Sequence, residues 1–186
     1  MAGSPSDSLA VFAVAGNDAQ AVDQGVRDLA DFLHMLGNPV GVISSGNSQS
    51  LERYLDLDYP LSILDVQRTM AVCAEDGAAA VILALSEETL NDDALQSVNV
   101  DVLGCDDKGL SEAEIVKSVA RFGCTVGKQT HIAGRTQESD ALAAQATEAY
   151  GQTDSSALSL SIAMVLAAGV RRANIKSALR VSRDLN

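Results

Sequence analysis

Short, continuous apolar runs recur along the chain, and a run of this kind is typical of a strand that is buried on both faces of a sheet. The clearest is the uninterrupted stretch of seven apolar residues at positions 79–85. Gly, Asn or Ser residues follow several of the runs, as expected where a strand ends in a turn. The runs predict strands at residues 9–14, 40–43, 79–85, 98–103 and 125–132.

Between and after these runs, apolar residues fall at every third or fourth position, which is the spacing of one face of a helix. Glycines follow several of these segments, as is common where a helix ends. Ser111 and Glu114 have the spacing of a capping box, which predicts that a helix begins there. The pattern predicts helices at residues 22–36, 63–73, 111–122, 139–150, 155–168 and 174–185.

Strands and helices alternate through the first two thirds of the chain, and helices alone make up the last third. This alternation predicts parallel strands joined by right-handed crossovers. We therefore expect an α/β fold of the P-loop or Rossmann type, with a mostly parallel sheet flanked by helices and a helical C-terminal third. A length of 186 residues suits one domain. We expect this domain to span residues 9–186 and residues 1–8 to form a disordered tail.

The acidic composition argues against two classes of partner. The 25 Asp and Glu residues outnumber the 13 Lys and Arg residues, for a net charge of −12. Nucleic acids and anionic membranes both attract clustered cationic side chains, so we expect neither as a partner. The three cysteines are far apart in the sequence, and the N-terminal segment lacks the basic and apolar regions of a signal peptide. These features predict a cytoplasmic protein.

The turn after the first predicted strand is the first place to look for a ligand, because open parallel sheets bind ligands at the carboxyl ends of their strands. A phosphate-binding loop needs glycines, a Lys for the terminal phosphates and a hydroxyl for magnesium. Here Gly16 is the one glycine, Gln20 stands where a Lys would be useful, and Ala21 has no hydroxyl. Asp18 would repel a phosphate. Two readings stay open for Gly16, Asn17, Asp18 and Gln20: a simple turn, or a weakened anion or nucleoside site.

Acidic residues follow two further predicted strands. Glu87 comes after the third strand, and Asp106 and Asp107 come after the fourth. Carboxylate oxygens can hold Mg²⁺ or act as general acids and bases. Glu87, Asp106 and Asp107 are therefore candidate metal ligands, with solvated loop residues as the alternative. ATP with Mg²⁺ is the cofactor that such a scaffold would take, but we expect none.

Six segments of the chain, in the same order, are similar to sequence motifs of one enzyme family. They are a strand, turn and helix at 9–26, LGxxVGVI at 36–43, a Pro followed by LDVQR at 60–68, an apolar strand ending in SEE at 77–88, and the stretches 100–110 and 154–179. Together they resemble the central, ATP-binding domain of the Mur ligases, which build the stem peptides of peptidoglycan. The resemblance covers residues 9–185 and implies an ATP-binding α/β domain.

The departures from that family concern its catalytic groups. The family's loop G-T-N-G-K-T-T corresponds to residues 16–22, where Gln20 replaces the Lys and Ala21 the first Thr. The family's magnesium-binding Glu corresponds to Ala84. Its DHLD motif corresponds to residues 108–111, which read KGLS and lack the Asp and His. The resemblance therefore implies the scaffold of an ATP-binding domain without its chemistry.

We accordingly expect a catalytically inactive relative of a Mur ligase central domain, linked to peptidoglycan synthesis. It would act as a binding or interaction module, with a protein partner or a second copy of itself. Two alternatives stay open. One is a nucleotide or small-ligand sensor. The other is a metal-dependent enzyme that uses acidic residues at the strand ends, drawn from Asp18, Glu87, Asp106 and Asp107.

Overall fold

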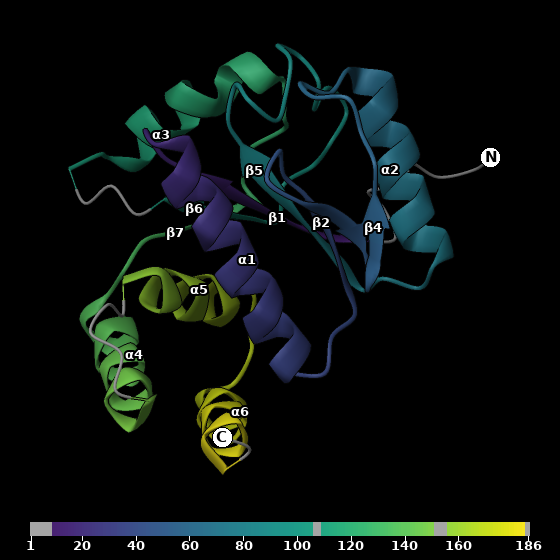
Figure 1. The fold of residues 1–186 in the computed structure, drawn as a ribbon. Coiled ribbons are helices and arrows are strands. Elements are labelled where there is room, and N and C mark those ends of the chain that lie inside the picture. Colours follow the sequence, from purple (N-terminus) through teal and green to yellow (C-terminus); the bar gives the residue numbers. More distant parts are fainter. Residues whose placement is uncertain (1–8, 106–108, 151–155, 185–186) are drawn as a thin grey trace.

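A computed structural model describes residues 9–105, 109–150 and 156–184 of the chain (Figure 1). The segments predicted as a disordered tail and as the acidic loop after the fourth predicted strand lie outside these ranges. The strands are β1 (Ala10–Ala15), β2 (Val40–Ile43), β3 (Ser48–Ser50), β4 (Arg53–Leu55), β5 (Ala80–Leu85), β6 (Val102–Cys105) and β7 (His131–Ala133). They form one seven-stranded sheet in the order β4-β3-β2-β5-β1-β6-β7.

The sheet is mixed and mostly parallel. Strand β5 is buried along its whole length between β2 and β1, and it runs parallel to both. Strands β6 and β7 continue the parallel part on the other side of β1. The prediction of a mostly parallel α/β sheet is confirmed. Strand β6 begins later than residue 98, and only the end of the predicted strand at 125–132 is present, as β7.

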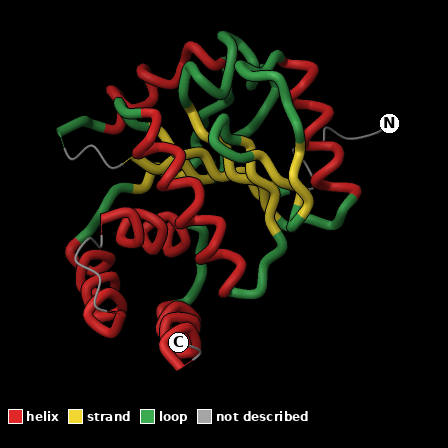
Figure 2. Tube along the Cα trace, in the orientation of Figure 1, coloured by secondary structure: helices red, strands yellow, loops and turns green. Residues whose placement is uncertain are grey.

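Helices cover both faces of this sheet, which lies in the middle of the molecule (Figure 2). They are α1 (Ala19–Met35), α2 (Ile63–Glu75), α3 (Glu112–Val119) with the short 3-10 helix η2 (Ala120–Phe122), α4 (Gln137–Tyr150), α5 (Ser156–Ala167) and α6 (Arg172–Asp184). Helices α2 and α3 contribute to the core on one face, and α1, α4, α5 and α6 contribute to the core on the other. The predicted helical C-terminal third is therefore present.

Local capping chemistry sets the start of two helices. Ser111 Oγ accepts a hydrogen bond from the Glu114 backbone N–H at 3.3 Å, and the Ser111 N–H donates to Glu114 Oε2 at 2.7 Å. This is the predicted capping box. The hydrogen bonds that the Ser111 N–H and the Ser111 hydroxyl donate to the carboxylate lower the pKa of Glu114. Ser62 and Asp65 form a second capping box at the start of α2. Within the described segments, no helix has the length and apolar character that a membrane span requires.

The hairpin formed by β3 and β4 was not predicted. It extends the sheet beyond β2 with antiparallel pairing, so the sheet is mixed rather than wholly parallel. Its strands read SQS and RYL, and β4 is largely exposed. An exposed edge strand does not need the continuous apolar run of a central strand, and therefore its sequence carries no such signal.

Asp76, at the end of α2, holds this hairpin against the helix. Its Oδ2 atom accepts hydrogen bonds from Ser50 Oγ at 2.5 Å and from Arg53 Nη2 at 2.6 Å. The hydrogen bonds from Ser50 and Arg53 lower the pKa of Asp76. A carboxyl with a lowered pKa in the folded state stabilises the protein above its unfolded pKa of about 3.9. That contribution is lost as the pH falls through the lower folded value.

We therefore expect Asp76→Asn to reduce the dependence of the free energy of unfolding on pH below about pH 4. Urea unfolding curves recorded over an acid pH series would measure this. Asp31→Asn is the control and should keep the wild-type dependence, because the Asp31 side chain is exposed on α1 and makes no hydrogen bond with any described residue. An Asp76→Asn protein with an unchanged acid dependence would contradict the proposed tie between hairpin and helix.

Candidate functional site

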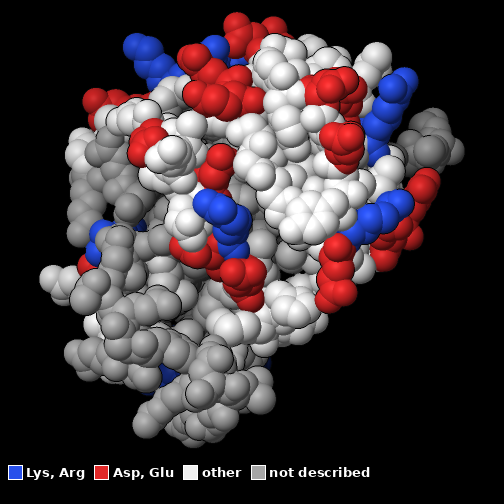
Figure 3. Space-filling view, viewed as in Figure 1, with Lys and Arg blue, Asp and Glu red and all other residues white. Residues whose placement is uncertain are grey.

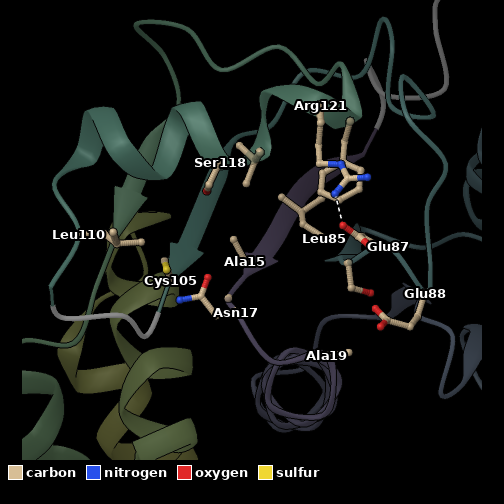
Figure 4. Close-up of a pocket in the computed structure, with 14 residues that line it drawn as sticks. Ala15, Asn17, Ala19, Leu85, Glu87, Glu88, Cys105, Leu110, Ser118 and Arg121 are labelled. Atoms are coloured by element: carbon tan, nitrogen blue, oxygen red, sulfur yellow. Dashed lines mark hydrogen bonds and ion pairs between the residues drawn. The ribbon is translucent and has the colours of Figure 1, made fainter.

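A pocket of about 400 Å³ opens where the carboxyl ends of β5, β1 and β6 meet at one edge of the sheet (Figure 4). Helix α1, which follows β1, packs on one face of the sheet. Helix α3, which follows β6, packs on the other. The chain therefore leaves these two neighbouring strands in opposite directions. Open α/β sheets commonly bind their ligands at such a switch point, so the pocket is a candidate binding site.

The walls of the pocket are apolar at one end and charged at the other. Figure 4 shows Leu110 and Cys105 on one side, and Glu87, Glu88 and Arg121 on the opposite side. The apolar lining consists of Ala15, Ala19, Leu85, Cys105, Leu110, Val119 and Phe122. The polar lining consists of Asn17, Ser86, Glu87, Glu88, Ser118 and Arg121, with Gly16 at the turn. A small molecule with an apolar body and a polar group would fit such a lining.

Only two of the four turn residues that were predicted to form a ligand site line the pocket. Gly16 and Asn17 line the pocket. Asp18 instead caps α1, because its Oδ1 atom accepts a hydrogen bond from the Gln20 backbone N–H at 3.0 Å. The Gln20 side chain is exposed, and neither Asp18 nor Gln20 is among the described lining residues. The protein's own carboxylate thus occupies a helix N-terminal amide that a phosphate would use.

Arg121 is the cation of this site, and no motif in the sequence singles it out. It is the only Lys or Arg among the described residues that line the pocket. Its Nη1 atom donates to Glu87, and its Nη2 and Nε atoms donate to Asp92 Oδ1 at 2.9 and 3.2 Å. The guanidinium carbon also lies 5.3 Å from the centre of the Phe122 ring. The hydrogen bonds that Arg121 donates to the carboxylates of Glu87 and Asp92 raise the pKa of Arg121, so this side chain stays charged and ion-paired.

A buried hydroxyl network holds the turn that carries the two glutamates. Thr89 is fully buried, and its Oγ1 atom accepts hydrogen bonds from Ser86 Oγ at 3.0 Å and from the Ser45 backbone N–H at 2.9 Å. The network joins the turn after β5 to the turn after β2. Glu87 and Glu88 lie between Ser86 and Thr89, so their backbone positions are set by these contacts.

The candidate metal ligands do not come together as a metal site in the part of the chain that the structure describes. Glu87 is ion-paired with Arg121, which competes with any cation for its carboxylate. Asp106 and Asp107 lie outside the described residues. Within residues 9–105, 109–150 and 156–184, no group of three or more His, Cys, Asp or Glu side chains could hold a metal ion.

Comparisons with known proteins assign the chain to no family. No protein-family model matches the sequence, and no curated protein matches it either. The structure itself shows an α/β fold with a mixed, mostly parallel seven-stranded sheet, flanking helices and C-terminal helices. The chain is therefore classified as an α/β protein with a pocket at the carboxyl edge of its sheet.

Proposed function

We propose that this protein is a non-catalytic domain that binds a small molecule in the pocket at the ends of β5, β1 and β6. The observation that carries the proposal is the pocket itself, which lies at the switch point of the sheet and has one charged and one apolar end. A cavity of about 400 Å³ lies near the lower end of the range of about 300–1,000 Å³ that is usual for small-ligand sites.

The residues in and around the pocket argue against a nucleoside triphosphate as this ligand. The position of the phosphate-binding Lys is taken by Gln20, which forfeits a charge-assisted contact of about 1.5–3 kcal/mol. That loss is roughly tenfold to a hundredfold in affinity. Arg121 cannot substitute for the Lys without leaving Glu87 and Asp92. Asp18 also places a negative charge at the start of α1, where a phosphate would bind.

The proposal extends to the origin and the pathway of the protein, on the basis of its resemblance to the Mur ligase central domain. The protein is then a degenerate relative of that domain and acts as a binding or interaction module linked to peptidoglycan synthesis. A protein partner or a second copy of the chain belongs to this part of the proposal. The similar segments around Gly16 support it, and so do the substitutions at Gln20 and Ala21 that remove the phosphate chemistry.

Thermal denaturation with added ligands tests the proposal, since a ligand that binds the folded state raises the Tm by mass action. We expect MgATP to leave the Tm unchanged in both the wild-type and the Gln20→Lys protein, with no release of phosphate. A single Lys restores neither the missing hydroxyl at Ala21 nor the missing carboxylate at Ala84. In a library of uncharged and cationic metabolites, we expect at least one compound to raise the wild-type Tm.

A pair of tryptophan variants, one inside the pocket and one outside it, tests whether a compound binds in the pocket. Ser118 lines the pocket, so Ser118→Trp should abolish the shift given by such a compound. Ser177→Trp, at an exposed position of α6, adds the same indole elsewhere and should keep the shift. A rise in Tm with MgATP, or MgATP hydrolysis, would contradict the proposal. Compounds whose effect survives Ser118→Trp would place the binding site elsewhere.

A further inference from the structure

Two carboxylates reach the pocket from the turn after β5, and they differ in their partners. Glu87 is ion-paired with Arg121. The Glu88 side chain makes no hydrogen bond or ion pair with any described residue, and Figure 4 shows its carboxylate directed into the pocket on the side of Ala19. Among the described lining residues, Glu88 is therefore the charged group that is available to a ligand.

The charge balance of the described lining favours a cation over an anion. Arg121 offsets the charge of Glu87 and is also held by Asp92, so no cation of the described lining compensates the charge of Glu88. A phosphate or carboxylate ligand would add a second negative charge beside Glu88. A protonated amine would instead form a charge-assisted hydrogen bond with it.

The remainder of the pocket suits an apolar group. Leu85 and Val119 are buried core residues whose atoms reach the pocket wall, and Phe122 lies beside them. Leu110 and Cys105 form the end away from the glutamates (Figure 4). A hydrocarbon or aromatic body in contact with these side chains would leave water, which favours binding.

The charge of the whole chain acts in the same direction. The net charge is −12, and Figure 3 shows Asp and Glu side chains on several separate parts of the visible face. The field of a strongly acidic protein raises the local concentration of cationic ligands and lowers that of anionic ones. The long-range field and the local charges of the pocket thus both favour a positively charged ligand.

We infer that the ligand of this pocket is a small amine, with its ammonium group on Glu88 and an apolar body against Leu85, Val119 and Phe122. This inference rests on the proposed binding function and adds the chemical class of the ligand. It also explains why the scaffold of a nucleotide site would carry two glutamates at its edge. The charge of one glutamate is offset by Arg121, and the other selects the ligand.

Isothermal titration calorimetry with three probes tests the inference. Phenethylamine, phenethyl alcohol and phenylacetate share one aromatic ring and differ in carrying an ammonium, a hydroxyl or a carboxylate group. We expect phenethylamine to bind about tenfold more tightly than the alcohol, and phenylacetate to bind most weakly. Glu88→Gln should make the affinities for the amine and the alcohol equal. Glu75→Gln, at an exposed position of α2 that does not line the pocket, should keep the preference for the amine.

Several outcomes would overturn the assignment of an amine. Equal affinities for amine and alcohol in the wild-type protein would do so, as would tightest binding of phenylacetate, a preference that survives Glu88→Gln, or no binding of any probe. The metabolite library separates these failures from failure of the proposed function. A compound of another class that raises the Tm, and loses this effect in Ser118→Trp, would leave the binding function standing. With no such compound, both would fall.

Discussion

Phe32→Ala is expected to lower the free energy of unfolding by about 4 kcal/mol, because it removes the ring of a fully buried side chain and leaves a cavity. Phe32 is only 1% exposed and lies on the inner face of α1. It belongs to the apolar core between this helix, the sheet and the C-terminal helices. Since the chain has three Phe and no Trp, a buried ring contributes much of the local packing.

Urea unfolding monitored by far-UV circular dichroism would measure this loss. Phe32→Leu keeps most of the buried volume and should cost far less than the alanine variant. Met35→Ala truncates a side chain on the same helix that is 41% exposed, and should change the free energy by about 0.5 kcal/mol or less. A Phe32→Ala protein as stable as the Met35→Ala protein would contradict the packing of α1 against the sheet.

The part of the fold that could be predicted is the part that depends on local pattern. The apolar run at 79–85 corresponds to β5, and the run at 40–43 corresponds to β2. Both strands are buried on both faces, so neither needs a polar side and the run stays continuous. The helices could be predicted for a similar reason, because one buried face imposes a spacing of three to four residues.

Strand boundaries on one side of the sheet could not be predicted, because apolar character reports burial and not pairing. Val98 and Val100 are buried in the core, yet they precede β6. Asn99, between them, forms only an isolated bridge with Thr125. Side chains in a loop that packs against the sheet are removed from water as fully as those in a strand, so the same apolar pattern fits both.

The pocket could be predicted only in part, because segments distant in sequence form it. Gly16 and Asn17 followed from the general rule that ligands bind after the first strand. Arg121 and Glu87 are 34 residues apart, and no local pattern links them. Ser118 belongs to α3 and Leu110 precedes this helix, and only the fold brings both to the pocket. Asp18 belongs to the predicted ligand site, whereas in the structure it caps α1, a position that Asp commonly takes at the start of a helix.

A close contact between β6 and α5 leads to the second large effect that we expect. Gly104 lies in β6, between Val14 of β1 and Ala133 of β7. A Cβ atom at Gly104 would lie 2.3 Å from Sδ of Met164, a fully buried residue of α5. Gly104→Ala should therefore lower the free energy of unfolding by about 2 kcal/mol, since the methionine or the helix must move.

A double-mutant cycle in urea identifies the partner in this contact. Met164→Ala alone should cost about 3 kcal/mol through the cavity that it leaves. In that background, Gly104→Ala should cost close to nothing, because the new methyl group enters the vacated space. Gly127→Ala, where a Cβ would have no neighbour within 4 Å, is the control and should shift the free energy by less than about 1 kcal/mol. Additive effects of Gly104→Ala and Met164→Ala would mean that α5 does not rest on the sheet at Gly104, and the helical C-terminal third would then cover this face differently.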